Sequence, residues 1–221
     1  MSIKLKEIDK IEILTLQDNY VDVAAFDGTE IVQRALPVKD KISEEIKIGL
    51  PALKRERFEN AGISLVESEE PRLLLDDSVL FLGEIPKQTE FEKGFPRMHY
   101  DEDGETKWDP IEEDSAIVAN VKRKGLVILS GCAHSGIINT VKYAREVSGV
   151  DSVFVVMGGF HLTGADFEPI IEPTTEALKT FNPQYVVPTH CTGRKAVMHL
   201  EKEMPDRFLL NMSGTKMVFA G

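Results

Sequence analysis

The stretch GLVILSGCAHSGIINTVKYAREVSGVDSVFVVMGGFH, residues 125–161, contains the pattern that decides the fold. It begins with an apolar run over 125–131 and ends with a second apolar run over 152–158. Between them, 136–147 repeat apolar residues at helical spacing. Continuous apolar runs are typical of buried strands, and an apolar stripe is typical of a helix packed on a sheet. The stretch therefore predicts a strand, a helix and a second strand.

The rest of the second half repeats this alternation. A strand is predicted over 115–121, helices over 167–181 and 193–203, and further strands over 184–190, 207–212 and 215–220. This order of elements is that of an α/β layer in which helices cover a mostly buried sheet. The fold class predicted from the residues is therefore α/β.

The first half is less regular. Residues 10–17 alternate apolar and polar and predict a strand, whereas 21–43 have no clear period and predict a loop. Pro51 interrupts a helical pattern over 44–60. Strands are also predicted over 61–68 and 78–85, followed by an irregular, charged loop over 86–114. We expect a single domain, 1–221, with an N-terminal part (1–40), a middle part (41–114) and an αβ part (115–221).

Composition excludes several classes of protein. The net charge of −11 argues against a nucleic-acid partner, which needs clustered lysine and arginine. No apolar window reaches the roughly 18 residues of a membrane-spanning helix, and the first residues lack the apolar core of a signal peptide. Two cysteines are too few for a disulfide scaffold. We expect a cytoplasmic protein without a membrane or nucleic-acid partner, acting on a small molecule.

Three of the five histidines stand where a predicted strand ends: His134, His161 and His190. Rigid strand ends that meet at one edge of a sheet are where ligands and metals commonly bind. Three imidazoles there would suit one Zn²⁺, or Fe²⁺ or Mn²⁺ if carboxylates join them. The alternative is that each is an ordinary polar residue, which is the interpretation we favour for His99 and His199.

Cys132 and Cys191 lie next to two of these histidines in the sequence. They permit three interpretations: a Cys₂His₂ zinc site, for which the spacing is unusual, two buried structural thiols, or a thiol redox function. The residues alone favour the structural thiols.

Several segments resemble the metallo-β-lactamase superfamily, and more narrowly its dihydropterin-type phosphate synthase subgroup, which is linked to methanopterin biosynthesis. The resemblance covers about residue 60 to the end and the first 34 residues or so. The segments that carry it are GLVILSGCAHSGIINTVKYAREVSGV, VFVVMGGFHLTG and VVPTHCTGRKA, with LQDNYVDV (16–23), FLGEIPKQTEFEKGFP (81–96) and NMSGTKMVF (211–219). It implies an αββα sandwich and a metal-dependent hydrolase or transferase acting on a phosphorylated or pterin-related small molecule.

The resemblance also implies functions for particular residues. His134 matches a metal-binding histidine and His190 matches the last histidine ligand. His161 lies near the position of a metal-bridging aspartate, so it is either a ligand or a catalytic acid–base. Arg194 would pair with a substrate phosphate near a helix start, or is an ordinary surface arginine. The other candidates for substrate binding are Asn19, Glu84, Thr163 and Thr215.

The sequence departs from the superfamily in one respect, because it contains no H-x-H-x-D-H motif. That motif supplies most ligands of the two-metal site, and its absence implies a truncated first half and at most one bound metal. An inactive remnant that serves binding or assembly is the alternative to an enzyme. The truncation would also expose apolar sheet surface, which implies a homodimer or an artificially lost segment.

Overall fold

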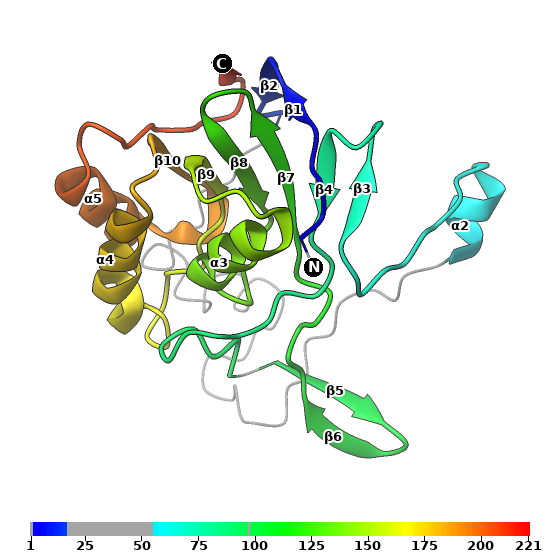
Figure 1. Cartoon of the computed structure of the whole chain (residues 1–221). Coiled ribbons are helices and arrows are strands. Elements are labelled where there is room, and N and C mark those ends of the chain that lie inside the picture. The colour runs from blue at the N-terminus through cyan, green and yellow to red at the C-terminus, as the bar shows by residue number, and fades with distance from the viewer. Residues whose placement is uncertain (1, 17–54, 97) are drawn as a thin grey trace.

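Seven strands form the central sheet of the computed structural model, which describes residues 2–16, 55–96 and 98–221. Across the sheet the order is β10, β9, β8, β7, β4 and β3, and β1 also pairs with β7 (Figure 1). The strands are Glu7–Ile8 (β1), Arg72–Leu74 (β3), Val79–Phe81 (β4), Ala116–Val121 (β7), Gly125–Ser130 (β8), Val153–Gly158 (β9) and Tyr185–Pro188 (β10).

Three helices cover one face of this sheet: Ile137–Ser148 (α3), Ile171–Phe181 (α4) and Arg194–Glu203 (α5) (Figure 1). Their apolar faces pack against alternate residues of the strands and form the larger of two cores. The largest fully buried side chains in it include Leu80, Leu126, Ile138, Leu178 and Leu200. The α/β class and the predicted alternation over 115–203 are therefore confirmed.

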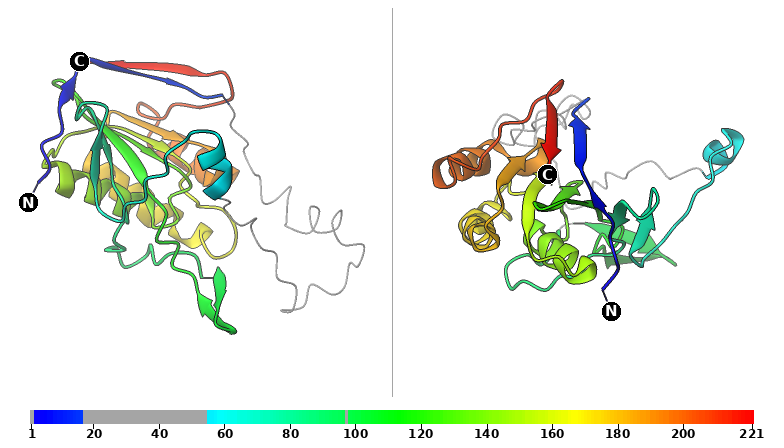
Figure 2. Two further views of the ribbon diagram at one scale, coloured as in Figure 1. Left: turned by 90° about the vertical axis from the view of Figure 1, so that its right-hand side faces the viewer. Right: turned by 45° about the horizontal axis from the view of Figure 1, so that its top comes forward.

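A two-stranded antiparallel sheet lies on the opposite face and joins the two ends of the chain. It consists of Lys10–Leu14 (β2) and Lys216–Ala220 (β11) (Figure 2). The inward residues of both strands pack with Phe154 and Tyr185 in a second, smaller core. The predicted strands at 10–17 and 215–220 are thus present, with shorter bounds.

The remaining described elements extend from this body. A hairpin is formed by His99–Glu102 (β5) and Glu105–Trp108 (β6), and a short helix by Arg55–Asn60 (α2) (Figure 1). Two single turns of 3₁₀ helix, Glu168–Ile170 (η1) and His190–Thr192 (η2), precede α4 and α5. None of the described helices is long and apolar enough to cross a membrane.

Three predictions about secondary structure were wrong. Residues 61–68 form no strand, because their apolar side chains, such as Val66, are exposed and pair with no neighbour in the described sheet. Residues 207–212 make a single bridge, Phe208 to Val186, instead of a strand. The segment 86–114 is not irregular throughout, since it contains the β5–β6 hairpin. The predictions for 21–43 and Pro51 lie outside the described residues.

Several large apolar side chains of the described residues are exposed. Ile117 on β7 is 41% exposed and stands on the sheet face opposite the helices. Its cross-strand partner Leu129 lines the same open depression. Other exposed large apolar residues of the described chain include Leu14, Leu16, Leu74, Leu75, Leu210, Met212 and Val218.

Backbone hydrogen bonds continue past the ends of the parallel strands and hold the loops that follow. Gly159 donates its N–H to the Gly131 carbonyl at 2.8 Å, and Thr189 donates to the Gly158 carbonyl at 2.8 Å. Phe160 N–H donates to the hydroxyl of Thr192, which is fully buried, at 3.0 Å. These bonds tie the loop after β9 to its neighbours on both sides.

The carboxylate of Glu92 anchors the loop over 86–96 to the start of α3. It is only 4% exposed and accepts the N–H groups of Ile138 at 3.0 Å and Asn139 at 2.9 Å. The side chain of Asn139 in turn accepts the N–H groups of Gln88 and Thr89. A side chain at Gly136 would collide with Glu92, so glycine is needed there.

Glu92 should make stability depend on pH. Burial raises the pKa of its carboxyl from 4.5 to about 7, although the bonds from Ile138 and Asn139 and the charge of Lys142 oppose the shift. Because the folded chain favours the protonated form, this stabilisation is complete below pH 4.5 and is lost as the pH rises towards 7. Across this pH window, the free energy of unfolding measured with urea should fall by about 3 kcal/mol more for the wild type than for Glu92→Gln. The exposed Glu90→Gln should keep the wild-type profile, and parallel profiles for wild type and Glu92→Gln would contradict the expectation.

Replacing Thr192 should destabilise the loop after β9. Thr192→Val removes the hydroxyl and leaves the buried N–H of Phe160 without its acceptor, which costs about 1–3 kcal/mol. Denaturant unfolding measures the loss. Thr192→Ser keeps the hydroxyl and serves as the matched control, so a valine variant as stable as the serine variant would show that the bond contributes nothing.

Candidate functional site

The carboxyl ends of β8, β9 and β10 meet at one edge of the sheet. The three strands are parallel to one another, so the chain leaves them on the same side. Cys132 follows β8, His161 follows β9, and His190 with Cys191 follows β10. The predicted convergence of strand ends is therefore present.

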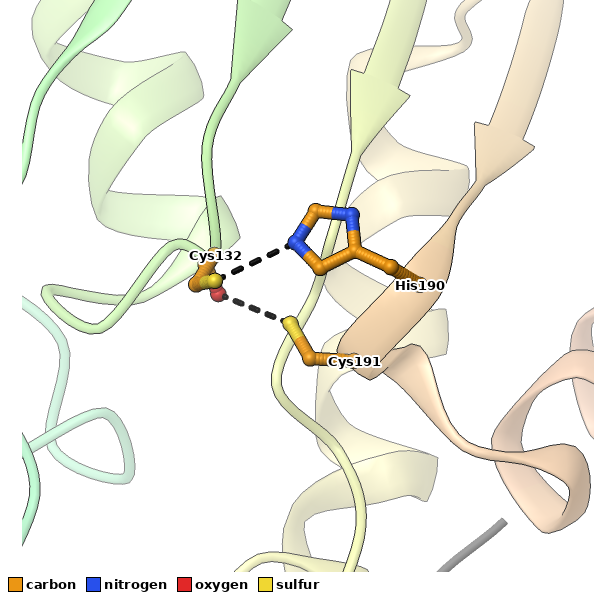
Figure 3. A group of neighbouring side chains, drawn as sticks. All are labelled: Cys132, His190 and Cys191. Carbon is orange, nitrogen blue, oxygen red and sulfur yellow. Dashed lines mark hydrogen bonds between the residues drawn. The ribbon is translucent and has the colours of Figure 1, made fainter. Parts of the chain in front are cut away.

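Cys132, His190 and Cys191 form the tightest cluster at this edge. The Sγ atom of Cys132 lies 3.1 Å from Nε2 of His190, and the Cys191 thiol lies 3.5 Å from the Cys132 carbonyl oxygen. One ligand atom from each residue falls within 4.8 Å of the others. Figure 3 shows the side chains pointing toward one another, Cys132 from the loop after β8 and the other two from the end of β10.

Gly159 makes room for this cluster. A Cβ atom at this position would lie 2.4 Å from the Cys191 sulfur and 2.6 Å from Nε2 of His190, far inside van der Waals contact. A glycine is required where a backbone must approach reactive side chains this closely. The space beside the Cys191 thiol and the His190 imidazole therefore exists because Gly159 has no side chain.

Cys132 is the electrostatic centre of the cluster. Its pKa is lowered by hydrogen bonds, first from Cys191 and then from His134 and His190. The hydrogen bond between the two cysteines, together with burial, raises the pKa of the Cys191 thiol. The bond to Cys132 likewise raises the pKa of His134. The arrangement is that of a half-buried sulfur close to three hydrogen-bonding side chains, an environment that favours the thiolate form, which binds a metal or attacks an electrophile.

His134 and His161 form the other part of the site. Their ring centroids are 4.7 Å apart at an interplanar angle of 80°. Burial, and then the neighbouring His134, lowers the pKa of His161 to about 4, so its imidazole is neutral. Its Nδ1 atom is buried and has no hydrogen-bond partner among the described residues. A neutral imidazole with an unused nitrogen is able to bind a metal or exchange a proton with a substrate.

The backbone at this pair is strained. Ala133 has a φ of 52° and His161 a φ of 46°, in the left-handed region that residues other than glycine rarely occupy. Such strain persists where the surrounding structure imposes it, and it is concentrated at functional sites. The two loops therefore hold the imidazoles in orientations that relaxed chains would not adopt.

A cavity of about 470 Å³ opens beside the two histidines. Aromatic side chains form much of its wall, and Lys93 and Asp166 contribute charge. The Phe95 ring packs edge-on against His161 at 5.0 Å, and its carbonyl accepts the indole N–H of Trp108 at 2.9 Å. The aromatic residues that line the cavity are Phe91, Trp108, Phe160 and Phe167.

The other predicted site residues are distributed over three places. Thr163 and Arg194 come together in a second cavity of about 300 Å³. Glu84 lines an acidic depression with four other glutamates. Thr215 lies in the turn before β11, where its hydroxyl accepts the N–H of Met212 at 3.1 Å. Asn19 lies outside the described residues.

Sequence reasoning underestimated two groups of residues. The thiols of Cys132 and Cys191 face His190 as candidate ligands, whereas the pattern favoured structural thiols. The signal was their adjacency to His134 and His190 in the chain. The aromatic wall of the cavity was missed, because Trp108 comes from the hairpin and Phe167 from the loop before η1.

Two curated proteins of Methanocaldococcus jannaschii are similar to this chain. The first, 7,8-dihydropterin-6-methyl-4-(β-D-ribofuranosyl)-aminobenzene-5′-phosphate synthase, is 36% identical over 160 residues, which are 70% of this chain and 52% of that protein. The second, an uncharacterised protein, is 31% identical over 161 residues, covering 73% of this chain and 54% of its own length. The chain thus spans about half the length of the curated relatives it matches. No protein-family model matches the sequence.

A solved structure supports the same relationship. The structure is that of Tm1679, a metal-dependent hydrolase of the β-lactamase superfamily, and it superposes with a TM-score of 0.61 at 26% identity. The match covers 72% of this chain and 59% of that structure. The chain is thus a homologue of the dihydropterin-type synthase in sequence and carries the fold of the metallo-β-lactamase superfamily.

Proposed function

We propose that this chain is a metal-dependent enzyme that acts on a phosphorylated, pterin-related small molecule. The observation that carries the proposal is the position of His134 and His161, which line an aromatic cavity directly beside the Cys132–His190–Cys191 cluster. The proposed substrate is supported by the sequence relative, which is named as a dihydropterin-type phosphate synthase. The proposed metal dependence is supported by the similar solved structure, which is that of a metal-dependent hydrolase.

The cavity suits a planar, polar ring. Its volume of about 470 Å³ is within the usual range for small-molecule sites. Phe167 and Trp108 line the cavity. Stacking on an aromatic side chain stabilises a bound aromatic by about 0.5–1.5 kcal/mol for each pair. Lys93 supplies a cation for a phosphate at the rim.

Metal binding and proton transfer are assigned to different residues of the site. Cys132, His190 and Cys191 are the residues that would hold the metal, and a bound divalent ion supplies Lewis acidity and lowers the pKa of water. His161 stays neutral beside the cavity, so its imidazole can accept a proton from a substrate group or return one. Phe95 and Phe167 pack against the His161 ring and fix its orientation.

Binding is measurable through Trp108, the single tryptophan of the chain, which lines the cavity. A 7,8-dihydropterin phosphate should change its fluorescence saturably, and inorganic phosphate alone should bind more weakly. Phe167→Ala should weaken dihydropterin binding about tenfold, because one stacking partner is lost. Tyr100→Ala removes an exposed aromatic of the hairpin and should leave the affinity unchanged. The absence of a saturable signal with wild type would contradict the proposed substrate class.

Turnover of the same compound tests the function of His161. His161→Gln should lower kcat by about 10²–10⁴-fold while metal content and dihydropterin affinity remain at wild-type values, because the variant loses a proton-transfer group. Metal content is determined by elemental mass spectrometry on the purified chain. Loss of the metal in this variant would make His161 a ligand instead. Purified wild type without metal or turnover would support the inactive remnant.

A further inference from the structure

We propose that the metal site of this chain is a thiolate site, in which Cys132, Cys191 and His190 are the protein ligands and a soft divalent ion such as Zn²⁺ is preferred. The sequence predicts three histidines as ligands, whereas the tightest group of candidate ligand atoms among the described residues is Cys132, His190 and Cys191. The inference rests on the proposed function for the use of the metal in catalysis, but its own evidence is the geometry of the cluster.

The distances fit a single ion. Ligand atoms around a tetrahedral zinc lie roughly 3.5–3.8 Å apart, given bonds of about 2.3 Å to sulfur and about 2.1 Å to nitrogen. The atoms of Cys132 and His190 are 3.1 Å apart, and the ligand atoms of all three residues fall within 4.8 Å. Small side-chain rotations would therefore place all three around one ion.

The orientation of His190 fits the same interpretation. Its Nδ1 atom lies 2.9 Å from the hydroxyl of Thr189, and its Nε2 atom faces the Cys132 sulfur. A metal-binding imidazole commonly uses one nitrogen for the ion and the other for an outer partner that holds the ring. Thr189 is only 6% exposed, so this outer partner is itself held in place.

The donor set indicates which ions the site would take. Two thiolates and an imidazole favour Zn²⁺ or Co²⁺, whereas Mg²⁺ and Mn²⁺ prefer carboxylate and carbonyl oxygens. The described cluster contains two cysteines and a histidine and no carboxylate. Three protein ligands also leave a fourth position for water or substrate, as in catalytic zinc sites with a Cys₂His set. His134, which hydrogen-bonds to the same sulfur, lies beside this set.

His161 is placed for a different function. Its ring packs between Phe95 at 5.0 Å and Phe167 at 4.7 Å, on the wall of the cavity. The loop that carries it still contributes to the metal site through Gly159, whose missing side chain leaves space beside Cys191 and His190. One short segment therefore provides space for the ion and a proton-transfer group for the substrate.

Cobalt titration of the full chain, stripped of metal and kept reduced, tests the inference. We expect one Co²⁺ per chain, with a thiolate-to-cobalt charge-transfer band in the near ultraviolet and the visible spectrum of tetrahedral cobalt. Zn²⁺ should displace the cobalt and Mn²⁺ should not. Cys132→Ser and Cys191→Ser should each remove the charge-transfer intensity of one sulfur and weaken Co²⁺ binding by at least about 100-fold.

Two glycine variants provide a matched pair. Gly159→Ala inserts a methyl group into the space beside both ligands and should abolish the cobalt spectrum. Gly131→Ala adds a methyl group next to Cys132, where no atom lies within 4 Å, and should keep the spectrum. Circular dichroism and thermal unfolding of the metal-free variants verify that the fold is retained.

The outcomes separate this inference from the proposed function. Stoichiometric cobalt without a charge-transfer band, retained in both cysteine variants, would overturn the thiolate set and leave the proposed metal enzyme intact. A sulfur-ligated cobalt in a chain that binds no dihydropterin would support the thiolate set and contradict the proposed substrate. No binding of Co²⁺, Zn²⁺ or Mn²⁺ to the wild-type chain would overturn both.

Discussion

The parallel pairing of β8, β9 and β10 is the constraint on which the rest of this structure depends. It brings the ends of three strands to one sheet edge, and hydrogen bonds beyond those ends, such as Gly159 to Gly131 and Thr189 to Gly158, keep the loops in register. Cys132, His161 and His190 are far apart in the sequence but leave the sheet as neighbours. Because the backbone is fixed on both sides, the loops can hold strained conformations at Ala133 and His161.

A second constraint comes from the buried carboxylate of Glu92. It binds the first N–H groups of α3, and Asn139 of that helix returns hydrogen bonds to the loop that carries Glu92. A buried polar network of this kind persists when its groups find partners. It positions the loop that contributes Phe91 and Lys93, so this part of the cavity wall is attached to the helix that begins beside His134.

Predictions from the residues succeeded where a segment buries its own apolar face. The strands and helices over 115–203 were correct because each has a continuous run or a helical stripe, as in β8 and α3. The predictions were wrong where strand formation depends on hydrogen bonding to a neighbouring strand. Residues 61–68 have the composition of a strand but find no partner, and Phe208 makes only one bridge. The β5–β6 hairpin has four exposed residues in β6, so no alternating pattern marked it.

The sequence by itself determined the α/β class, the order of elements in the second half and the three strand ends that carry histidines, because these follow from local apolar patterns. Only the tertiary structure decided which side chains meet at that edge. Side-chain direction at the end of a strand depends on loop conformation and on the space left by neighbours. Gly159 leaves room beside Cys191 and His190, and the two thiols therefore lie beside an imidazole at the edge where the pattern predicted histidines alone. The distance of Cys132 from His190, 58 residues along the chain but 3.1 Å in space, is set by strand pairing and could not be read from either segment alone.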